Sequence, residues 1–188
     1  IIGCVLQPDD GTAHVLGCDV RAASAEALAE LRRRRVGFVF QRFHLIRGLT
    51  ALENVGVPLI LEGVRQSVAA RRSLELLDKV GLADQSRSYA HQLSVGQCQR
   101  IAFARALAAD PALILADEPT ASLDAESGQQ AMQLLRRLTI EAGKTAIVVT
   151  HDSRILPYAD RILVMDQGQL NELPATGEAP PSPAALGR

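Results

Sequence analysis

Apolar residues along the chain fall into two kinds of pattern. Three short runs, Val36–Phe40, Leu113–Ala116 and Thr145–Thr150, are almost continuously apolar. Runs of this kind are typical of strands that are buried on both faces of a parallel sheet. Between them lie longer segments in which apolar residues recur with helical spacing. We therefore predict an α/β fold in which buried strands alternate with helices.

The longest helical segment is an insertion at 49–91. It opens with the T-x-x-E pattern of a capping box at Thr50–Glu53, and we expect Pro58 to interrupt the helix that follows. A second helix is predicted over Val68–Val80, because its apolar residues keep helical spacing and Gly81 follows as a stop. These helices are expected to form a helical subdomain inserted into the sheet.

Polar and glycine-rich segments mark the remaining elements. Hairpins are predicted over 11–20 and 161–170, where glycines accompany short alternating stretches. Further helices are predicted over 22–31, 95–109 and 125–142, the last with Asp124 as its N-cap. From Glu172 onward the sequence is rich in proline, which predicts a disordered tail.

The composition is that of an ordinary globular domain. Of the 188 residues, 47% are hydrophobic and 22% are charged, and the formal net charge is −1. So small a net charge, with 3% aromatic residues, argues against a nucleic-acid partner. The four arginines Arg32–Arg35 are then best explained as the solvated end of a helix. No stretch approaches the ~20 apolar residues of a membrane span. Three cysteines without a C-x-x-C pair indicate a reducing, cytosolic setting.

The start of the predicted helix at Val95 offers a site for an anion. Ser94 stands at the N-cap position, and Val95 and Gly96 leave backbone N–H groups at the positive end of the helix dipole. Phosphate is the anion that such a site suits best.

A second polar group is expected where the predicted strands end. Asp117 and Glu118 follow the second apolar run, Gln41 follows the first and His151 follows the third. In open α/β sheets, ligands gather at the carboxyl ends of the strands. One of the two carboxylates could hold Mg²⁺ through water while the other faces a nucleophilic water.

The order of these motifs resembles that of a known family. The string LSVGQ, QR, ARAL, an apolar run, DEPT and SLD spans residues 93–124, with GFVFQ before it and THD after it. It resembles the nucleotide-binding subunit of ABC transporters, which has a P-loop NTPase-like (RecA-like) parallel sheet core with a helical subdomain insertion. The resemblance implies a partial ATPase core at 1–48, a helical subdomain at 49–95, the rest of the core at 96–171 and a tail at 172–188.

The resemblance also implies ATP and Mg²⁺ as ligands. Asp117 and Gln41 would hold Mg²⁺ or its waters, and Glu118 would act as general base on the attacking water. His151 would contact the γ-phosphate and support Glu118.

A second ATP-binding subunit is implied as a partner. Ser94, Gly96 and Gln97 would close on the γ-phosphate of a nucleotide held by a second copy of the chain. Asp124 would bridge that interface, so that a homodimer encloses two ATP molecules.

Two features depart from the family pattern. Val95 stands in place of the first glycine of LSGGQ, which limits backbone freedom but keeps the N–H group. The phosphate loop G-x-x-x-x-G-K-[ST] and a first strand with an aromatic residue for adenine are absent from the sequence. Because the chain opens where the helix of that loop would end, we expect an N-terminal truncation. Such a fragment should bind ATP weakly and hydrolyse it little or not at all.

The segment after Gln41 is unusually apolar for a loop, with Phe43, Leu45 and Ile46 close together. Exposed apolar patches usually mark a partner. In the resembled family a transmembrane permease docks here. We therefore expect these residues to contact a permease, which would hold the chain on the inner face of the cell membrane.

The segment VGFVFQRFHLIRGLTALENVGVPL most resembles subunits that serve lipoprotein release or macrolide-type export. Two alternatives stay open. The chain could be a shortened, non-catalytic interaction module, or a soluble ABC-type ATPase that acts on ribosomes or DNA. The latter ranks last, because the sequence has no second cassette, long coiled coil or C-x-x-C hook.

Overall fold

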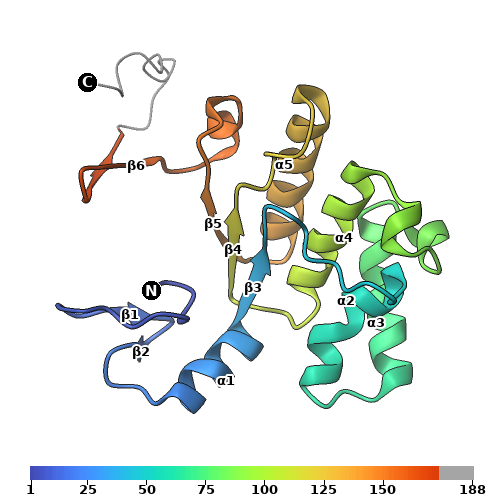
Figure 1. The fold of residues 1–188 in the computed structure, drawn as a ribbon, viewed down its shortest axis with the longest axis horizontal. Coiled ribbons are helices and arrows are strands. Elements are labelled where there is room, and N and C mark those ends of the chain that lie inside the picture. Colours follow the sequence, from blue (N-terminus) through green and yellow to red (C-terminus); the bar gives the residue numbers. More distant parts are fainter. Residues whose placement is uncertain (174–188) are drawn as a thin grey trace.

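A computed structural model of the chain describes residues 1–173. At its centre is a three-stranded parallel sheet in the order β3-β4-β5, formed by Val36–Val39, Leu113–Asp117 and Thr145–Val149 (Figure 1). The strands run side by side in register, so their carboxyl ends meet at one edge. The α/β architecture predicted from the apolar runs is thereby confirmed.

The remaining elements surround this sheet. The α-helices are α1 Ala25–Arg35, α2 Ala51–Leu61, α3 Gln66–Lys79, α4 Val95–Leu107 and α5 Ala125–Glu141. Short 3₁₀ helices are η1 Ala83–Gln85, η2 Ala90–Gln92 and η3 Ser153–Tyr158. Two antiparallel hairpins are formed by β1 His14–Val15 with β2 Cys18–Asp19, and by β6 Leu163–Asp166 with β7 Gln169–Glu172.

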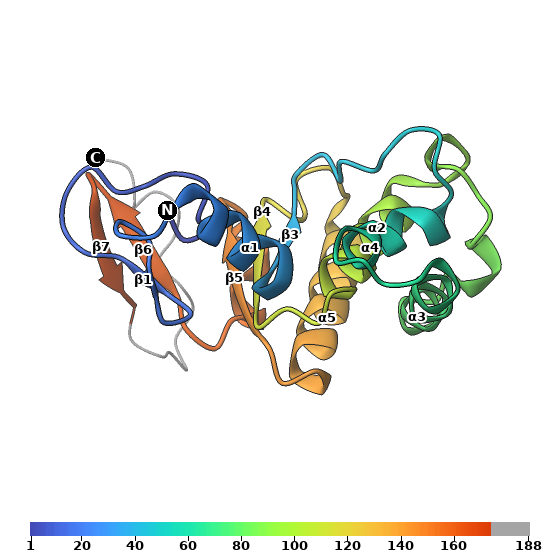
Figure 2. The same ribbon diagram turned by 90° about the horizontal axis from the view of Figure 1, so that it is seen from below.

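The two faces of the sheet pack against different elements. Ile114 and Ala116 of β4 belong to the larger core cluster, which also includes residues of α2, α3, α4 and α5. Leu113 of β4 belongs to a smaller cluster with α1 and the β1–β2 hairpin. Figures 1 and 2 show the four helices on one side of the sheet and the hairpins on the other. A Cβ at Gly37 would lie 2.1 Å from the Ala106 carbonyl oxygen, so only glycine permits this approach of β3 to α4.

The helical segment folds as the sequence predicts, with one exception. Thr50 and Glu53 form the expected capping box, and α2 and α3 pack together beside α4 (Figure 1). Pro58, however, does not interrupt α2, which continues to Leu61. Proline keeps a helical φ and removes one backbone hydrogen bond, and the burial of neighbouring Leu59 offsets that loss. The division at 49 and 95 into subdomains remains a prediction.

The prediction that β5 is buried on both faces was wrong. Ala146 and Val148 pack against the larger core cluster, whereas Ile147 is partly exposed and Val149 is 61% exposed. β5 is an edge strand of the sheet, and within residues 1–173 its second face remains open to solvent.

The predicted start of the tail at Glu172 was also wrong. Glu172 is the last residue of β7, pairs with Leu163 across the hairpin and forms a 2.7 Å ion pair with Arg161. Residues 174–188, where the rest of the predicted tail falls, lie outside the described part of the chain. Within residues 1–173, none of the helices has both the length and the apolar character that a membrane crossing requires.

Candidate functional site

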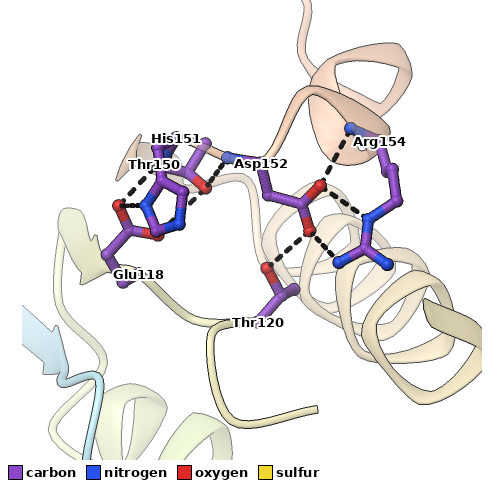
Figure 3. Close-up of polar contacts among 6 residues, drawn as sticks. All are labelled: Glu118, Thr120, Thr150, His151, Asp152 and Arg154. Atoms are coloured by element: carbon purple, nitrogen blue, oxygen red, sulfur yellow. Dashed lines mark hydrogen bonds and ion pairs between the residues drawn. The ribbon is translucent and has the colours of Figure 1, made fainter. Parts of the chain in front are cut away.

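The carboxyl edge of the sheet brings Glu118 and His151 into contact. Glu118 directly follows β4, and its backbone N–H donates to the Val149 carbonyl at 2.8 Å. His151 Nδ1 lies 2.7 Å from Glu118 Oε1, and the His151 backbone N–H donates to the same oxygen at 3.0 Å (Figure 3). The Thr150 hydroxyl donates to Oε2 at 3.2 Å. One short segment after β5 therefore holds both oxygens of the Glu118 carboxylate.

Glu118 adopts a backbone conformation that is unusual for its residue type. Its φ is +46°, in the left-handed region. Such a conformation costs about 1–3 kcal/mol and persists only where surrounding contacts hold it. The hydrogen bonds from Thr150 and His151 supply those contacts. The strained residue is thus also the candidate base.

The two side chains differ in their exposure to solvent. The Glu118 side chain is 18% exposed and the His151 side chain is 82% exposed. An ionised carboxylate only accepts hydrogen bonds, so the contact with Glu118 places a proton on Nδ1 of His151. Nε2 is then available to a ligand. The pair places a fixed carboxylate beside an accessible imidazole, and either type of group can act as a general base.

Asp117 and Gln41 lie at the same edge, but within residues 1–173 their side chains make no hydrogen bond to the pair. Asp117 ends β4, and Gln41 lies just beyond β3. Both are exposed, and neither side chain makes a hydrogen bond within residues 1–173. No group of three or more His, Cys, Asp or Glu side chains in this range is arranged to hold a metal ion. Two free oxygen donors suit Mg²⁺, which retains several waters and needs few protein ligands.

Ser94 and Gln97 form a capping box at the start of α4. The Ser94 Oγ accepts from the Gln97 backbone N–H at 3.2 Å, and the Gln97 side-chain oxygen accepts from the Ser94 N–H at 2.8 Å. A Cβ added at Gly96 would meet no atom of residues 1–173 within 4 Å. Val95 is exposed as the first helical residue, so its side chain causes no distortion of the turn.

This turn and Asp124 line one groove of about 850 Å³. The groove lies between the end of α3, the start of α4 and α5, and neither Glu118 nor His151 lines it. Asp124 is the N-cap of α5 and accepts from the backbone and hydroxyl of Ser127 at 3.0 and 2.6 Å. These hydrogen bonds hold the pKa of Asp124 below its usual value. The candidate residues thus form two groups, one at the sheet edge and one at the groove.

The segment after Gln41 is held from α4. Phe43 and His44 both have positive φ, and Arg105 donates to both of their carbonyl oxygens, with 2.6 Å to His44. Burial lowers the pKa of the Arg105 guanidinium. Ile46 is 45% exposed, whereas Phe43 and Leu45 are partly buried.

Asn54 of α2 holds the same segment from the other side. Its side-chain oxygen accepts from the Ile46 N–H at 2.7 Å, and its amide donates to the Leu49 carbonyl at 3.1 Å. The segment therefore has a fixed shape with Ile46 as its most exposed apolar residue among the three that the sequence selected.

Sequence reasoning missed several residues that hold these sites. Arg105 and Asn54 act on backbone carbonyls, and a sequence motif gives no sign of such contacts. Thr150 and Asp152 flank His151 directly, and their hydroxyl and carboxylate could have been recognised as candidate supports for it.

Comparisons with known proteins identify the family. The sequence pattern of the family described as ABC transporter matches residues 1–121. The macrolide export ATP-binding/permease protein MacB of Escherichia coli strain K12 is 44% identical over 170 residues, which cover 90% of this chain and 26% of that protein. MacB 1 of Escherichia coli O1:K1 is 43% identical over 178 residues, which cover 95% of this chain and 27% of that protein. The chain thus spans about a quarter of the length of these curated relatives.

Solved structures of ATP-binding cassettes are also similar to this chain. A dimeric post-hydrolysis structure of the ATP-binding cassette MJ0796, bound to ADP and Pi, has a TM-score of 0.80 at 40% identity and covers 93% of this chain and 78% of that one. The structure of cbiO1 from Clostridium perfringens has a TM-score of 0.81 at 28% identity, and the match covers 90% of this chain and 68% of that one. These matches confirm the predicted P-loop NTPase-like fold and, with MacB, the resemblance to the macrolide-export branch. The chain therefore belongs to the ABC transporter family.

Proposed function

We propose that this chain is an ATP-binding and ATP-hydrolysing cassette that powers an ABC membrane transporter. The observation that carries the proposal is the Glu118 carboxylate, fixed at the end of the sheet by Thr150 and His151. The relatives support it, since MacB is an ATP-binding/permease protein and the MJ0796 cassette holds ADP and Pi. A permease partner would hold the chain on the inner face of the cell membrane.

In the proposed reaction, Glu118 takes a proton from the attacking water. The water oxygen forms a bond to the γ-phosphorus as the bond to the bridging oxygen of ADP breaks, and ADP leaves with the electron pair. Mg²⁺, when bound, would neutralise charge on the phosphates. Asp117 and Gln41 would hold it through their free oxygens, and His151 would contact the γ-phosphate while orienting Glu118.

The groove residues are assigned to a nucleotide held by a second copy of the chain. The Ser94 Oγ accepts a hydrogen bond within its own turn, so its hydroxyl proton is free to be donated to a phosphate. The open space at Gly96 lets the phosphate approach the helix N-terminus. Gln97 and Asp124 would complete that surface. The dimeric form of the MJ0796 cassette supports this arrangement.

The permease is assigned to the segment that contains Phe43, Leu45 and Ile46. Ile46 offers the cleanest test, because it is exposed and makes its hydrogen bonds through its backbone. Ile46→Ser should reduce transport per ATP hydrolysed in the assembled transporter. Ile140→Ser on α5 is the matched control, since Ile140 is also exposed. Equal coupling in the two variants would contradict the assignment.

The 188-residue polypeptide by itself should bind ATP weakly, because its sequence contains no G-x-x-x-x-G-K-[ST] loop. The alternative is a non-catalytic interaction module that takes no part in ATP hydrolysis. Titration of the polypeptide with ATP, with and without a cassette that supplies the phosphate loop, separates the two. ATP binding above that of the added cassette alone supports the catalytic proposal, and binding equal to that of the cassette alone supports the module.

The decisive experiment replaces Glu118 by Gln in the assembled transporter that contains this chain. Loss of the general base should slow ATP hydrolysis by about 100-fold or more. ATP binding, measured by equilibrium dialysis, should persist. Glu126→Gln is the control, because Glu126 is an exposed carboxylate in the first turn of α5. Undiminished hydrolysis in the Glu118 variant would refute the assignment of the base.

A further inference from the structure

A second carboxylate lies next to the proposed catalytic pair, in a cluster of its own. Asp152 accepts from the Arg154 side chain through both oxygens at 2.8 Å, and from the Arg154 backbone N–H at 3.0 Å (Figure 3). The Thr120 hydroxyl donates to Asp152 Oδ2 at 3.3 Å. The Asp152 side chain is 14% exposed and Thr120 is 2% exposed. Four donors therefore occupy a carboxylate that the proposed mechanism does not use.

These contacts join the two loops that carry the catalytic pair. Thr120 lies two residues after Glu118, in the loop that follows β4. Asp152 is adjacent to His151, in the loop that follows β5. The hydrogen bond between Thr120 and Asp152 is therefore a bridge between the Glu118 loop and the His151 loop.

The Asp152 backbone is also linked to the Glu118 carboxylate through the Thr150 hydroxyl. The Asp152 N–H donates to the Thr150 hydroxyl oxygen at 3.0 Å, and that hydroxyl donates to Glu118 Oε2. Because Thr150 has a single hydroxyl proton, its acceptance of the Asp152 N–H helps to aim that proton at Glu118. A shift of Asp152 would move the donor that orients the proposed base.

A purely local role does not account for this arrangement. Asp152 is the N-cap of η3, and a cap needs one oxygen to accept the Arg154 backbone N–H. The second oxygen accepts from Thr120 and from the Arg154 guanidinium, neither of which a cap requires.

We propose that Asp152 is a positioning residue for ATP hydrolysis. Its hydrogen bonds with Arg154 and Thr120 keep Glu118 and His151 in their mutual orientation. The proposal rests on the proposed ATPase function of the pair. The Asp152 carboxylate is occupied by hydrogen bonds within the protein, so in this proposal Asp152 and Thr120 act through Glu118 and His151.

Thr120 offers a matched set of variants. Its methyl carbon lies beside Gly128, because a Cβ added at Gly128 would be 3.6 Å from that carbon. Thr120→Val keeps the shape and removes the hydroxyl, whereas Thr120→Ser keeps the hydroxyl and removes the methyl. Asp152→Asn keeps the acceptor for the cap and removes the charge.

Two measurements test the proposal. In the assembled transporter, Thr120→Val and Asp152→Asn should lower kcat for ATP by about tenfold with KM unchanged, since small displacements of catalytic groups are costly. Thr120→Ser should stay within about twofold of the wild type, because it keeps the bridging hydroxyl. In the full chain without nucleotide, the ¹⁵N shifts of the His151 ring should change in Thr120→Val and Asp152→Asn and be restored in Thr120→Ser.

The outcomes are separable. Unchanged ring shifts and unchanged kcat in folded Thr120→Val and Asp152→Asn proteins would overturn the proposal. Equal losses in Thr120→Val and Thr120→Ser would also overturn it, because they would assign the effect to packing. The ring shifts need no hydrolysis, so they report on the positioning of His151 even if Glu118→Gln shows that the proposed base is wrong.

Discussion

The sheet edge at Glu118 and the turn at Ser94 are held in opposite ways. Glu118 is bound by Thr150 and His151, which lie more than thirty residues away along the chain and reach it through the pairing of β4 with β5. Ser94 is bound by Gln97, three residues away in its own helix. One site is built by the tertiary fold, and the other by a single turn of helix.

The two sites therefore differ in what they need from the proposed second copy of the chain. Glu118 and His151 already contact each other within one chain. The side-chain hydrogen bonds of the turn at Ser94 stay within the turn, and within residues 1–173 Gly96 beside it faces open space. The proposed second copy is therefore required at the turn and not for the contact within the catalytic pair.

The largest effects are expected at the sheet edge. Glu118→Gln should lower ATP turnover by about 100-fold or more, and His151→Ala by a smaller factor. Because the two residues act as a unit, the double variant should be no slower than Glu118→Gln alone. Single-turnover hydrolysis by the assembled transporter measures all three. Fully multiplicative losses would show that the two residues act independently and would contradict their role as a unit.

Gly96→Ala should separate stability from function. The added Cβ meets nothing in the described part of the chain, so the free energy of unfolding should change by less than about 1 kcal/mol. Turnover should fall by about tenfold or more if the methyl group disturbs a phosphate held by a second copy. Gly37→Ala is the opposite control and should destabilise the fold by about 1–3 kcal/mol through its clash with the Ala106 carbonyl. Urea unfolding and ATPase assays distinguish the two, and wild-type turnover in Gly96→Ala would count against the trans assignment.

The two capping boxes provide a pair of matched substitutions. Ser94→Ala and Thr50→Ala each remove a side-chain acceptor at a helix start and should each cost about 1 kcal/mol of stability. Only Ser94→Ala should also impair hydrolysis, because Thr50 lies outside both proposed sites. Thermal unfolding and steady-state ATPase rates provide the comparison. Equal ATP hydrolysis rates in the two variants would show that Ser94 acts only as a helix cap.

The smallest expected difference is in the response to acid. The hydrogen bonds from Arg154 hold the pKa of Asp152 below its ordinary value of 3.8. Its carboxylate therefore favours the folded state above that value, and the contribution is lost as the pH falls through the lower folded pKa. The contribution should be at most about 1 kcal/mol, as for other ion pairs near the surface.

Asp152→Asn should accordingly show a smaller stability difference between pH 6 and pH 3 than the wild type. Urea unfolding at the two pH values measures it. Asp9→Asn is the control, because Asp9 is exposed and makes no side-chain hydrogen bond within residues 1–173. Ser94→Ala should show no such pH dependence, since a hydroxyl cap does not titrate. An unchanged acid response in Asp152→Asn would contradict the role of the ion pair.

Features that depend on neighbours in sequence could be predicted from the sequence. The capping box at Thr50, the N-cap Asp124 and the turn at Ser94 formed as expected, because each is decided within four residues. Features that depend on tertiary contacts could not. The positive φ of Glu118 and the donation from Thr150 to Glu118 both follow from how β4 pairs with β5.

Two errors have the same origin. The continuous apolar run of β5 indicated burial on both faces, but its place at the edge of the sheet leaves Val149 exposed. Pro58 indicated a break in α2, but the burial of Leu59 in the core outweighs one lost hydrogen bond. Local pattern sets what a segment prefers, and the surrounding packing decides the outcome.

Arg105 connects α4 to the segment that follows Gln41. The helix begins at the Ser94 turn, and near its other end Arg105 grips the backbone of Phe43 and His44. Thirteen residues of uninterrupted helix form a rod of about 20 Å without a joint. A displacement of the segment at Phe43 would therefore be carried by α4, as one rigid element, toward Ser94 at its far end.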